Sequence, residues 1–212
     1  MPATTAPDGG VLTKPVVGIH GSPGVALRVL RAAGWDEDDV HLSPYDVRDP
    51  FRALRAGEQH VMIVKYEVRE PDLAVSRPLV EDARAVLVGR HHALAARTSV
   101  TLDDVAGYPA FRCPEHFPPD VWDRVVPPRT PAGRVIDRVH PMTTVDDMVR
   151  ILAATDAVHV SFASLASVVP QGIAVIPVRD LPPAPVALCW LRTTPLPAAV
   201  ARLVADAEAG PR

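Results

Sequence analysis

Residues that could take part in chemistry follow the first apolar run of the chain. This run, VVGIH, ends in His20, and Gly21 and Ser22 come directly before a stretch whose apolar spacing predicts a helix. Backbone N–H groups at a helix start can hold a carboxylate, helped by the helix dipole. Ser22 is equally suited to cap the helix, so we expect it to serve as a cap, a ligand contact or both. We predict that His20, Gly21 and Ser22 bind a ligand.

A second group of candidates comes later in the chain. Thr143 and Thr144 precede another predicted helix, as Ser22 precedes the first, and capping alone would also explain them. Ser161 and Phe162 end the apolar run DAVHVSF. Arg112 follows a short predicted strand and could reach an anion, although an arginine more often forms a surface ion pair. We count all five among the ligand-binding candidates.

His20 also keeps catalysis open, because a histidine at the edge of a cleft can exchange a proton near neutral pH. Its catalytic partner would be Lys65 or Glu67, which end the run HVMIVKYE, and Cys113 or His159 would lie in the same cavity. A lone histidine is more often structural or in contact with a ligand. Both roles of His20 therefore stay open.

The remaining motifs indicate neither a metal nor a cofactor. His91, His92 and His116 lie in predicted loops without the spacing of metal ligands. The glycines of GIHGSPG fit no nucleophile elbow, phosphate-binding loop or dinucleotide fingerprint. Cys113 and Cys189 stand far apart, as expected of reduced thiols in an intracellular protein. We predict that the protein has no metal and no cofactor.

Composition argues against two classes of partner. The 212 residues carry a net charge of −3, and their arginines are scattered among acidic residues, whereas a nucleic-acid surface needs clustered Lys and Arg. No apolar run approaches the ~20 residues of a membrane span, and the N-terminus does not resemble a signal peptide. We therefore expect a cytoplasmic protein that binds neither DNA directly nor a membrane.

Alternating strands and helices are expected to position these residues. Residues 1–14 are small, polar and rich in Pro and Gly, which predicts a disordered tail. Strand, helix, strand, helix and strand then follow in order, which is typical of an α/β unit; they cover residues 16–20, 25–34, 40–42, 48–58 and 60–66. Tyr66 stands where the chain would begin to cross to a second unit, and we count it as a ligand contact.

A second α/β unit is predicted to follow the first. Two extended runs, 73–82 and 83–90, carry the chain away from the first unit, and the proline-dense segment 115–133 is expected to form at most one helical turn. A final strand over 186–191 and a helix over 195–209 are suited to rejoin the first unit. Two lobes joined in this way leave a cleft, which is a common place for a ligand.

Four stretches, in this order and spacing, resemble one known family. They are VGIHGSPGVALRVL; DPFRALRAGEQHVMIV, with His60 at a usual aspartate; the run from Arg77 to Phe111, with Ala93 at a usual proline; and TTVDDMVRILAAT with the strands after it. Together they resemble the effector-binding domain of LysR-type transcriptional regulators, from about Val16 to Val204.

The resemblance implies a two-lobed α/β fold like that of the type 2 periplasmic binding proteins. Lobe I would comprise residues 15–80 plus 180–212, and lobe II residues 81–179. Effectors of such domains contact the first turn, and the domains pair side by side, so a homodimer is expected. Family members carry a winged helix-turn-helix ahead of this domain, but only fourteen residues precede Pro15 here. We expect a stand-alone descendant, with an excised fragment as the alternative.

Two functions remain open at this point. The first is binding of a small metabolite, anionic or aromatic, by a stand-alone effector domain. The second is a cofactor-independent biosynthetic enzyme, a lyase, isomerase or cyclase, that uses the cleft for acid–base chemistry. Binding is the leading hypothesis, and the enzyme is kept as the alternative because a chain without a DNA-binding half has no obvious output from binding alone. Modulation of a full-length regulator through a heterodimer is a third, weaker possibility.

Overall fold

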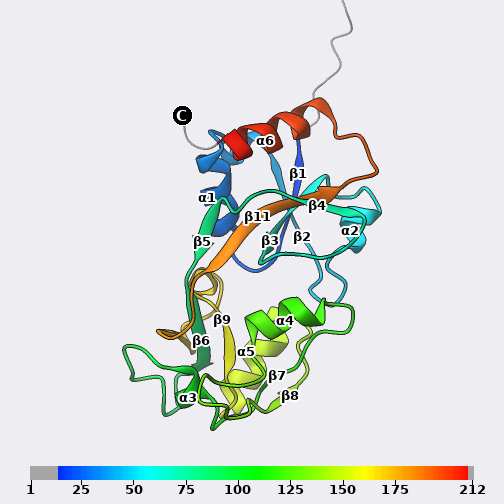
Figure 1. Cartoon of the computed structure of the whole chain (residues 1–212). Coiled ribbons are helices and arrows are strands. Elements are labelled where there is room, and N and C mark those ends of the chain that lie inside the picture. Colours follow the sequence, from blue (N-terminus) through cyan, green and yellow to red (C-terminus); the bar gives the residue numbers. More distant parts are fainter. Residues whose placement is uncertain (1–13, 210–212) are drawn as a thin grey trace, which may run out of the picture.

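Three short segments near the start of the chain form neighbouring parallel strands. In this computed structural model, which describes residues 14–209, β1 (Val16–Ile19) lies between β2 (His41–Pro44) and β3 (Val61–Lys65) and is parallel to both. Helix α1 (Pro23–Ala32) connects the first two strands and buries Val25, Ala26, Val29 and Leu30 against the sheet. The expected strand–helix–strand unit is therefore present (Figure 1).

The end of the chain completes this first sheet. Strand β11 (Ala184–Leu191) pairs antiparallel with β3, and α6 (Ala198–Ala209) covers the sheet beside α1 (Figure 1). Two short strands, β4 (Leu73–Val75) and β5 (Val80–Asp82), pair with β11 on its other side. The run 73–82 thus belongs to the first sheet, instead of leading away from it, because β11 offers it a free edge for pairing.

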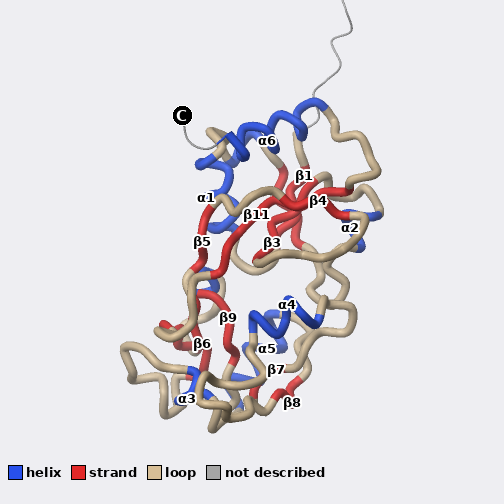
Figure 2. The backbone as a smooth tube through the Cα atoms, in the orientation of Figure 1, coloured by secondary structure: helices blue, strands red, loops and turns tan. Residues whose placement is uncertain are grey.

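A smaller sheet forms the second lobe. Strand β6 (Arg84–Gly89) lies between β9 (His159–Phe162) and β10 (Ile173–Pro177), antiparallel to both (Figure 2). All six residues of β6 are buried, as expected of a central strand. The first lobe also contains α2 (Arg52–Arg55) and η1 (Glu37–Asp39). The second lobe also contains α3 (Leu102–Val105), β7 (Ala110–Phe111), β8 (Arg138–His140), α5 (Val145–Ala154) and η2 (Ala163–Ser167).

The proline-dense segment is more ordered than we expected. Residues Pro119–Val125 form a seven-residue helix, α4, and not at most one turn. Pro119 takes the first helical position, where its missing N–H costs nothing, and Asp120 stands in the first turn. Val121, Trp122 and Val125 fall on one buried face. Apolar packing therefore stabilises a helix within a segment whose composition suggests a loop.

The chain passes between the two sheets at two places. It crosses at Ala83, between β5 and β6, and again over residues 178–183, between β10 and β11 (Figure 1). The division into lobe I (15–80 plus 180–212) and lobe II (81–179) stays a prediction, and β5, up to Asp82, pairs within the first sheet. The predicted tail lies outside the described residues except for Lys14. Within residues 14–209, no helix is long and apolar enough to span a bilayer.

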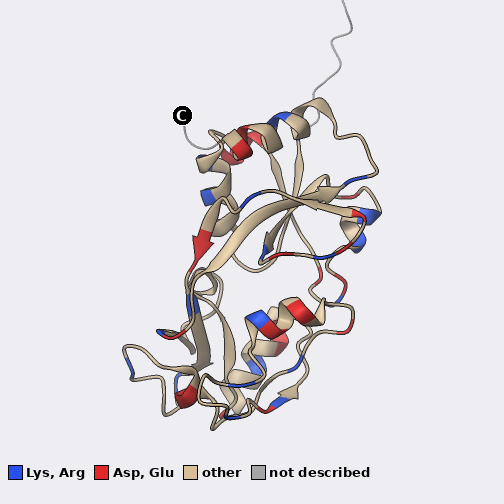
Figure 3. Cartoon of the chain, viewed as in Figure 1, with Lys and Arg blue, Asp and Glu red and all other residues tan. Residues whose placement is uncertain are grey.

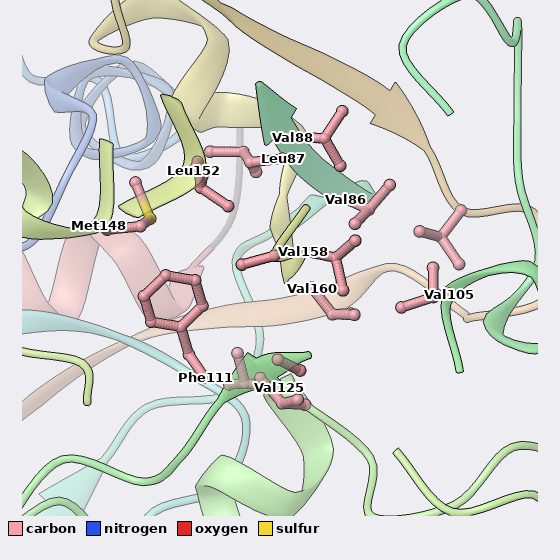
Figure 4. Packing of buried hydrophobic residues seen from close by; sticks show 14 of the residues in the cluster. Val86, Leu87, Val88, Val105, Phe111, Val125, Met148, Leu152, Val158 and Val160 are labelled. Atoms are coloured by element: carbon pink, nitrogen blue, oxygen red, sulfur yellow. The ribbon is translucent and has the colours of Figure 1, made fainter. Parts of the chain in front are cut away.

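Close packing of α5 on β6 holds the second lobe together. Leu87 of β6 points toward Met148 and Leu152 of α5, whereas Val86 and Val88 point to the other side of the strand, as Figure 4 shows. Gly89, at the end of β6, permits the short distance between these elements. A Cβ atom at this position would lie 2.3 Å from the carbonyl oxygen of Leu152 and 2.5 Å from the His91 ring.

We expect Gly89→Ala to lower the free energy of unfolding by about 1–3 kcal/mol, because α5 would have to move away from β6. Gly107→Ala is a matched control, since nothing lies within 4 Å of an added Cβ there. Its effect should stay within about 0.5 kcal/mol. Urea unfolding of both variants checks this, and equal stabilities would contradict the packing argument.

Candidate ligand-binding site

A cavity lies between the two lobes and receives side chains from both. Its volume is about 90 Å³. Lobe I contributes the ends of β1 and β3, the loop after β2 and the start of α1, and lobe II contributes α4, α5, β9 and η2. Five of the predicted site residues line it: His20, Ser22, Lys65, Ser161 and Phe162. The turn after the first strand therefore faces the space between the lobes.

Ser22 has two structural partners at this turn. Its Oγ accepts a hydrogen bond from the backbone N–H of Gly24 at 3.2 Å, which caps α1, and lies 2.7 Å from the Ser167 Oγ of the other lobe. Gly21 adopts φ +71°, a conformation that favours glycine, and its added Cβ would lie 2.7 Å from Leu165. The turn therefore caps a helix and joins the lobes at the same time.

Lys65 extends into the cavity wall and forms a buried ion pair. Its Nζ lies 3.1 Å from Oδ2 of Asp82 and 4.0 Å from the centre of the Phe162 ring. Asp82 is 2% exposed and also accepts a hydrogen bond from Ser164 Oγ at 2.6 Å. Burial lowers the pKa of Lys65, and the nearby carboxylate of Asp82 opposes that effect. The charge of Lys65 is thus already balanced by the protein.

Arg84 lies behind the cavity and connects several elements. Its guanidinium donates to the backbone oxygens of Ser161 and Arg124, each at 3.0 Å, to the backbone oxygen of Val125, and to the Tyr66 hydroxyl at 2.6 Å. Tyr66 itself has φ +67°, unusual for a residue other than glycine. Tyr66 therefore holds Arg84 in place, and it does not line the cavity.

Two histidines line the cavity in uncharged form. His159 is fully buried between Trp122, whose ring centre is 6.2 Å away, and Phe111, at 5.1 Å. Burial lowers the pKa of His159 to about 3, with smaller contributions from His20 and Arg84. Burial likewise lowers the pKa of His20, whose Nδ1 lies 3.4 Å from the backbone oxygen of Tyr45.

The other candidates lie elsewhere. Glu67 and Arg112 are exposed; Glu67 pairs with Arg69 at 3.2 Å. Thr143 and Thr144 border a shallower hollow, which His20 and Gly21 also line. The Thr144 hydroxyl caps α5 by accepting the N–H of Asp147 at 3.0 Å. The roles predicted for all these residues stay predictions.

The structure also brings groups to the cavity that sequence reasoning missed. Trp122, Val121 and Phe117 come from the segment expected to be irregular, and Tyr45 from the loop after β2. The pattern PPDVWDRV holds the missed signal, because a proline at the first helical position precedes apolar residues spaced for one face. Cys113 does not line the cavity, and burial raises its pKa to about 11.

Comparison with known proteins shows which family the chain belongs to. The LysR substrate binding domain family matches residues 36–209. The chain belongs to this family. The resemblance noted in the sequence is thereby confirmed, and so is the two-lobed α/β fold. No curated protein matches the chain in sequence.

Several solved structures share the fold of this LysR substrate-binding domain at low sequence identity. CbnR, a LysR family transcriptional regulator, is 19% identical with a TM-score of 0.67, over 92% of this chain and 68% of CbnR. The effector binding domain of QuiR in complex with shikimate is 17% identical with a TM-score of 0.67, over 92% and 95%. A Corynebacterium glutamicum OxyR mutant is 14% identical with a TM-score of 0.66, over 95% and 65%.

The ion pair of Lys65 and Asp82 can be tested by a double-mutant cycle. Asp82→Asn should lower the free energy of unfolding by about 3 kcal/mol, the lower end for a buried pair, because Lys65 keeps some contact with solvent. The loss in the double variant Asp82→Asn/Lys65→Met should be at least about 1 kcal/mol smaller than the sum of the two single losses. Glu67→Gln removes an exposed pair and should cost less than about 1 kcal/mol. Additive single losses in urea unfolding would disprove the coupling.

The lowered pKa of His159 predicts that the stability of the protein depends on pH. Since its pKa falls from 6.5 to about 3 on folding, the unfolded chain binds the extra proton between these values, and stability is lost as the pH falls through this window. The loss should be about 1.4 kcal/mol for each pH unit below 6.5. His159→Phe should flatten the slope by that amount in urea unfolding at pH 7 and pH 5. An unchanged slope would show that folding does not lower the pKa of His159.

Proposed function

We propose that this chain binds a small organic molecule in the cavity between its lobes and acts as an effector-sensing domain. The observation that carries the proposal is a cavity whose wall comes from both lobes, so a molecule held there contacts both at once. Sites between domains are common places for ligands. The solved complex of the QuiR effector binding domain with shikimate supports the same reading by analogy of fold.

The size of the cavity bears on how a ligand enters. At about 90 Å³ it is smaller than the roughly 300–1,000 Å³ of sites for drug-sized ligands. On the side away from the crossing strands, the lobes meet through the backbone N–H of His116, which donates to the backbone oxygen of Arg48 at 2.8 Å. Val47 packs into the core of lobe II beside this bond. Hinged separation of these loops would admit a ligand.

The finer predictions are retained as part of this proposal. Lys65, Ser161 and Phe162 remain the ligand contacts that the cavity supports best, with His20 and Ser22 at the first turn. A homodimer, a cytoplasmic location and an anionic or aromatic ligand remain predictions. Positions of Lys and Arg alternate with positions of Asp and Glu along the ribbon of both lobes in Figure 3, and this supports the expectation that the described residues do not bind DNA. The enzyme alternative stays a prediction.

A substitution that fills the cavity tests the proposal. Ala26 of α1 lines the cavity, whereas Ala32 of the same helix does not. Metabolites that raise the melting temperature of the wild-type chain should bind at least tenfold more weakly to Ala26→Leu, because the added side chain occupies their space. Ala32→Leu introduces the same change outside the cavity and should keep wild-type affinity.

Calorimetric titration of the same ligands gives the affinities, and melting curves establish that both variants fold. Equal affinities for the two variants would place the ligand elsewhere. Mass spectrometry of the recovered ligand adds a second result. An unchanged ligand supports binding, and a converted one would turn the proposal toward the enzyme.

A further inference from the structure

The wall that lobe II contributes to the cavity contains polar atoms without a protein partner. Trp122 Nε1 and His159 Nδ1 are both buried, and neither has a hydrogen-bond partner among residues 14–209. Their rings stack against each other with an interplanar angle of 27°. Buried polar groups in proteins are nearly always hydrogen-bonded, so such a pair beside a cavity calls for explanation. Both residues also line the cavity, so a molecule bound there can supply a missing partner.

The charges around the cavity are balanced within the protein. Lys65 is paired with Asp82, and the guanidinium of Arg84 donates to three backbone oxygens and the Tyr66 hydroxyl, behind the cavity. His20 and His159 are uncharged near neutral pH, because burial lowers the pKa of each. Among the described residues that line the cavity, none therefore carries a positive charge left to balance an anion.

An anion in this cavity would lose its hydration without gaining a counter-charge. Burying an unpaired charge is far more costly than burying a neutral group that finds a hydrogen bond. At the start of α1, the Ser22 hydroxyl and the N–H of Gly24 are already bonded to each other, and Ser22 also contacts Ser167, so neither group is free for an anion. The charge balance of the cavity thus favours a neutral ligand.

The remaining surface of the cavity is aromatic and aliphatic. Phe117, Trp122 and Phe162 line it together with Val121 and Met148. Flat rings pack well against such side chains, and the indole N–H of Trp122 can only donate a hydrogen bond. The ligand that fits has an aromatic ring and an oxygen that accepts a hydrogen bond.

We propose that the cavity selects an uncharged aromatic molecule with a carbonyl or hydroxyl oxygen, and discriminates against a carboxylate of the same shape. The oxygen accepts the hydrogen bond of Trp122 Nε1–H, and the ring lies among the aromatic side chains. This inference rests on the proposed function, because it assigns a ligand class to the same cavity. Of the two ligand classes predicted from the sequence, it chooses the aromatic one and excludes the anion.

Two matched pairs of probes test the inference on the full chain at pH 7. Benzamide and benzoate differ little in shape but differ in charge, as do 4-hydroxybenzamide and 4-hydroxybenzoate. We expect the amide of each pair to bind at least tenfold more tightly in calorimetric titration. The indole N–H signal of Trp122 should shift on binding in NMR spectra, and its assignment follows from its loss in Trp122→Phe.

Variants separate the polar contact from general packing. Trp122→Phe keeps an aromatic ring but removes the N–H, and should weaken amide binding at least fivefold. Trp190→Phe, in β11 and outside the cavity wall, should leave it unchanged. Melting curves establish that both variants are folded. Amide affinity unaffected by Trp122→Phe would overturn the hydrogen bond on which the inference depends.

The outcomes distinguish this inference from the proposed function. Benzoates that bind as tightly as the amides, and more weakly to Ala26→Leu, would overturn the ligand class and leave the cavity as the binding site. Amides that bind equally to the wild type and to Ala26→Leu would overturn the proposed function itself. Absence of binding by all four probes would overturn the ligand class, whereas the proposed function would still be tested by the metabolites and Ala26→Leu.

Discussion

The arrangement of the two lobes depends on a pair of opposite charges that flank one crossing residue. Asp82 and Arg84 stand on either side of Ala83, and both are almost fully buried. A buried charge is tolerated only where partners satisfy it, so each side chain constrains the elements around it. In an extended segment, residues two positions apart point to the same side, which directs both charges toward the region between the lobes.

Each charge then determines part of the site. Asp82 binds Lys65 of lobe I and Ser164 of lobe II, which joins the end of β3 to the start of η2. Arg84 binds the last carbonyl groups of α4, where the helix dipole favours a cation. This contact positions α4, and α4 carries Trp122 into the cavity wall. The charged groups that hold the lobes together are thus already paired within the protein, and no unpaired charge remains among the described residues at the cavity between the lobes.

Local patterns in the sequence predicted the strand–helix–strand unit that begins the first lobe and the turn that follows its first strand. The strand that ends at His20, the capping hydroxyl of Ser22 and the buried run ending at Lys65 are each contained within a few consecutive residues. The pairing of β4 and β5 with β11 joins residues more than a hundred positions apart, and no local pattern reports it. For the same reason, no local pattern could predict that Trp122 and His159 lie side by side. Their neighbourhood arises from tertiary packing, which also made a helix of a segment whose prolines indicated a loop.

The two sides of the cavity are held by bonds of unequal strength. On the crossing side, Asp82 and Arg84 bind their partners through buried charged groups, and hydrogen bonds to charged groups are stronger than neutral ones. On the other side, where the loop after β2 descends toward α4 in Figure 1, a backbone hydrogen bond from His116 to Arg48 and the packing of Val47 hold the lobes. Neutral bonds of this kind contribute only about 0.5–1.5 kcal/mol each. Separation of the lobes is therefore least costly at the loops, with the charged crossing as the fixed side. A molecule that lies between Lys65 and Trp122 reaches from the charged crossing toward the loop contact. The free energy of its binding can therefore offset the cost of breaking the loop contact, which is the weaker of the two.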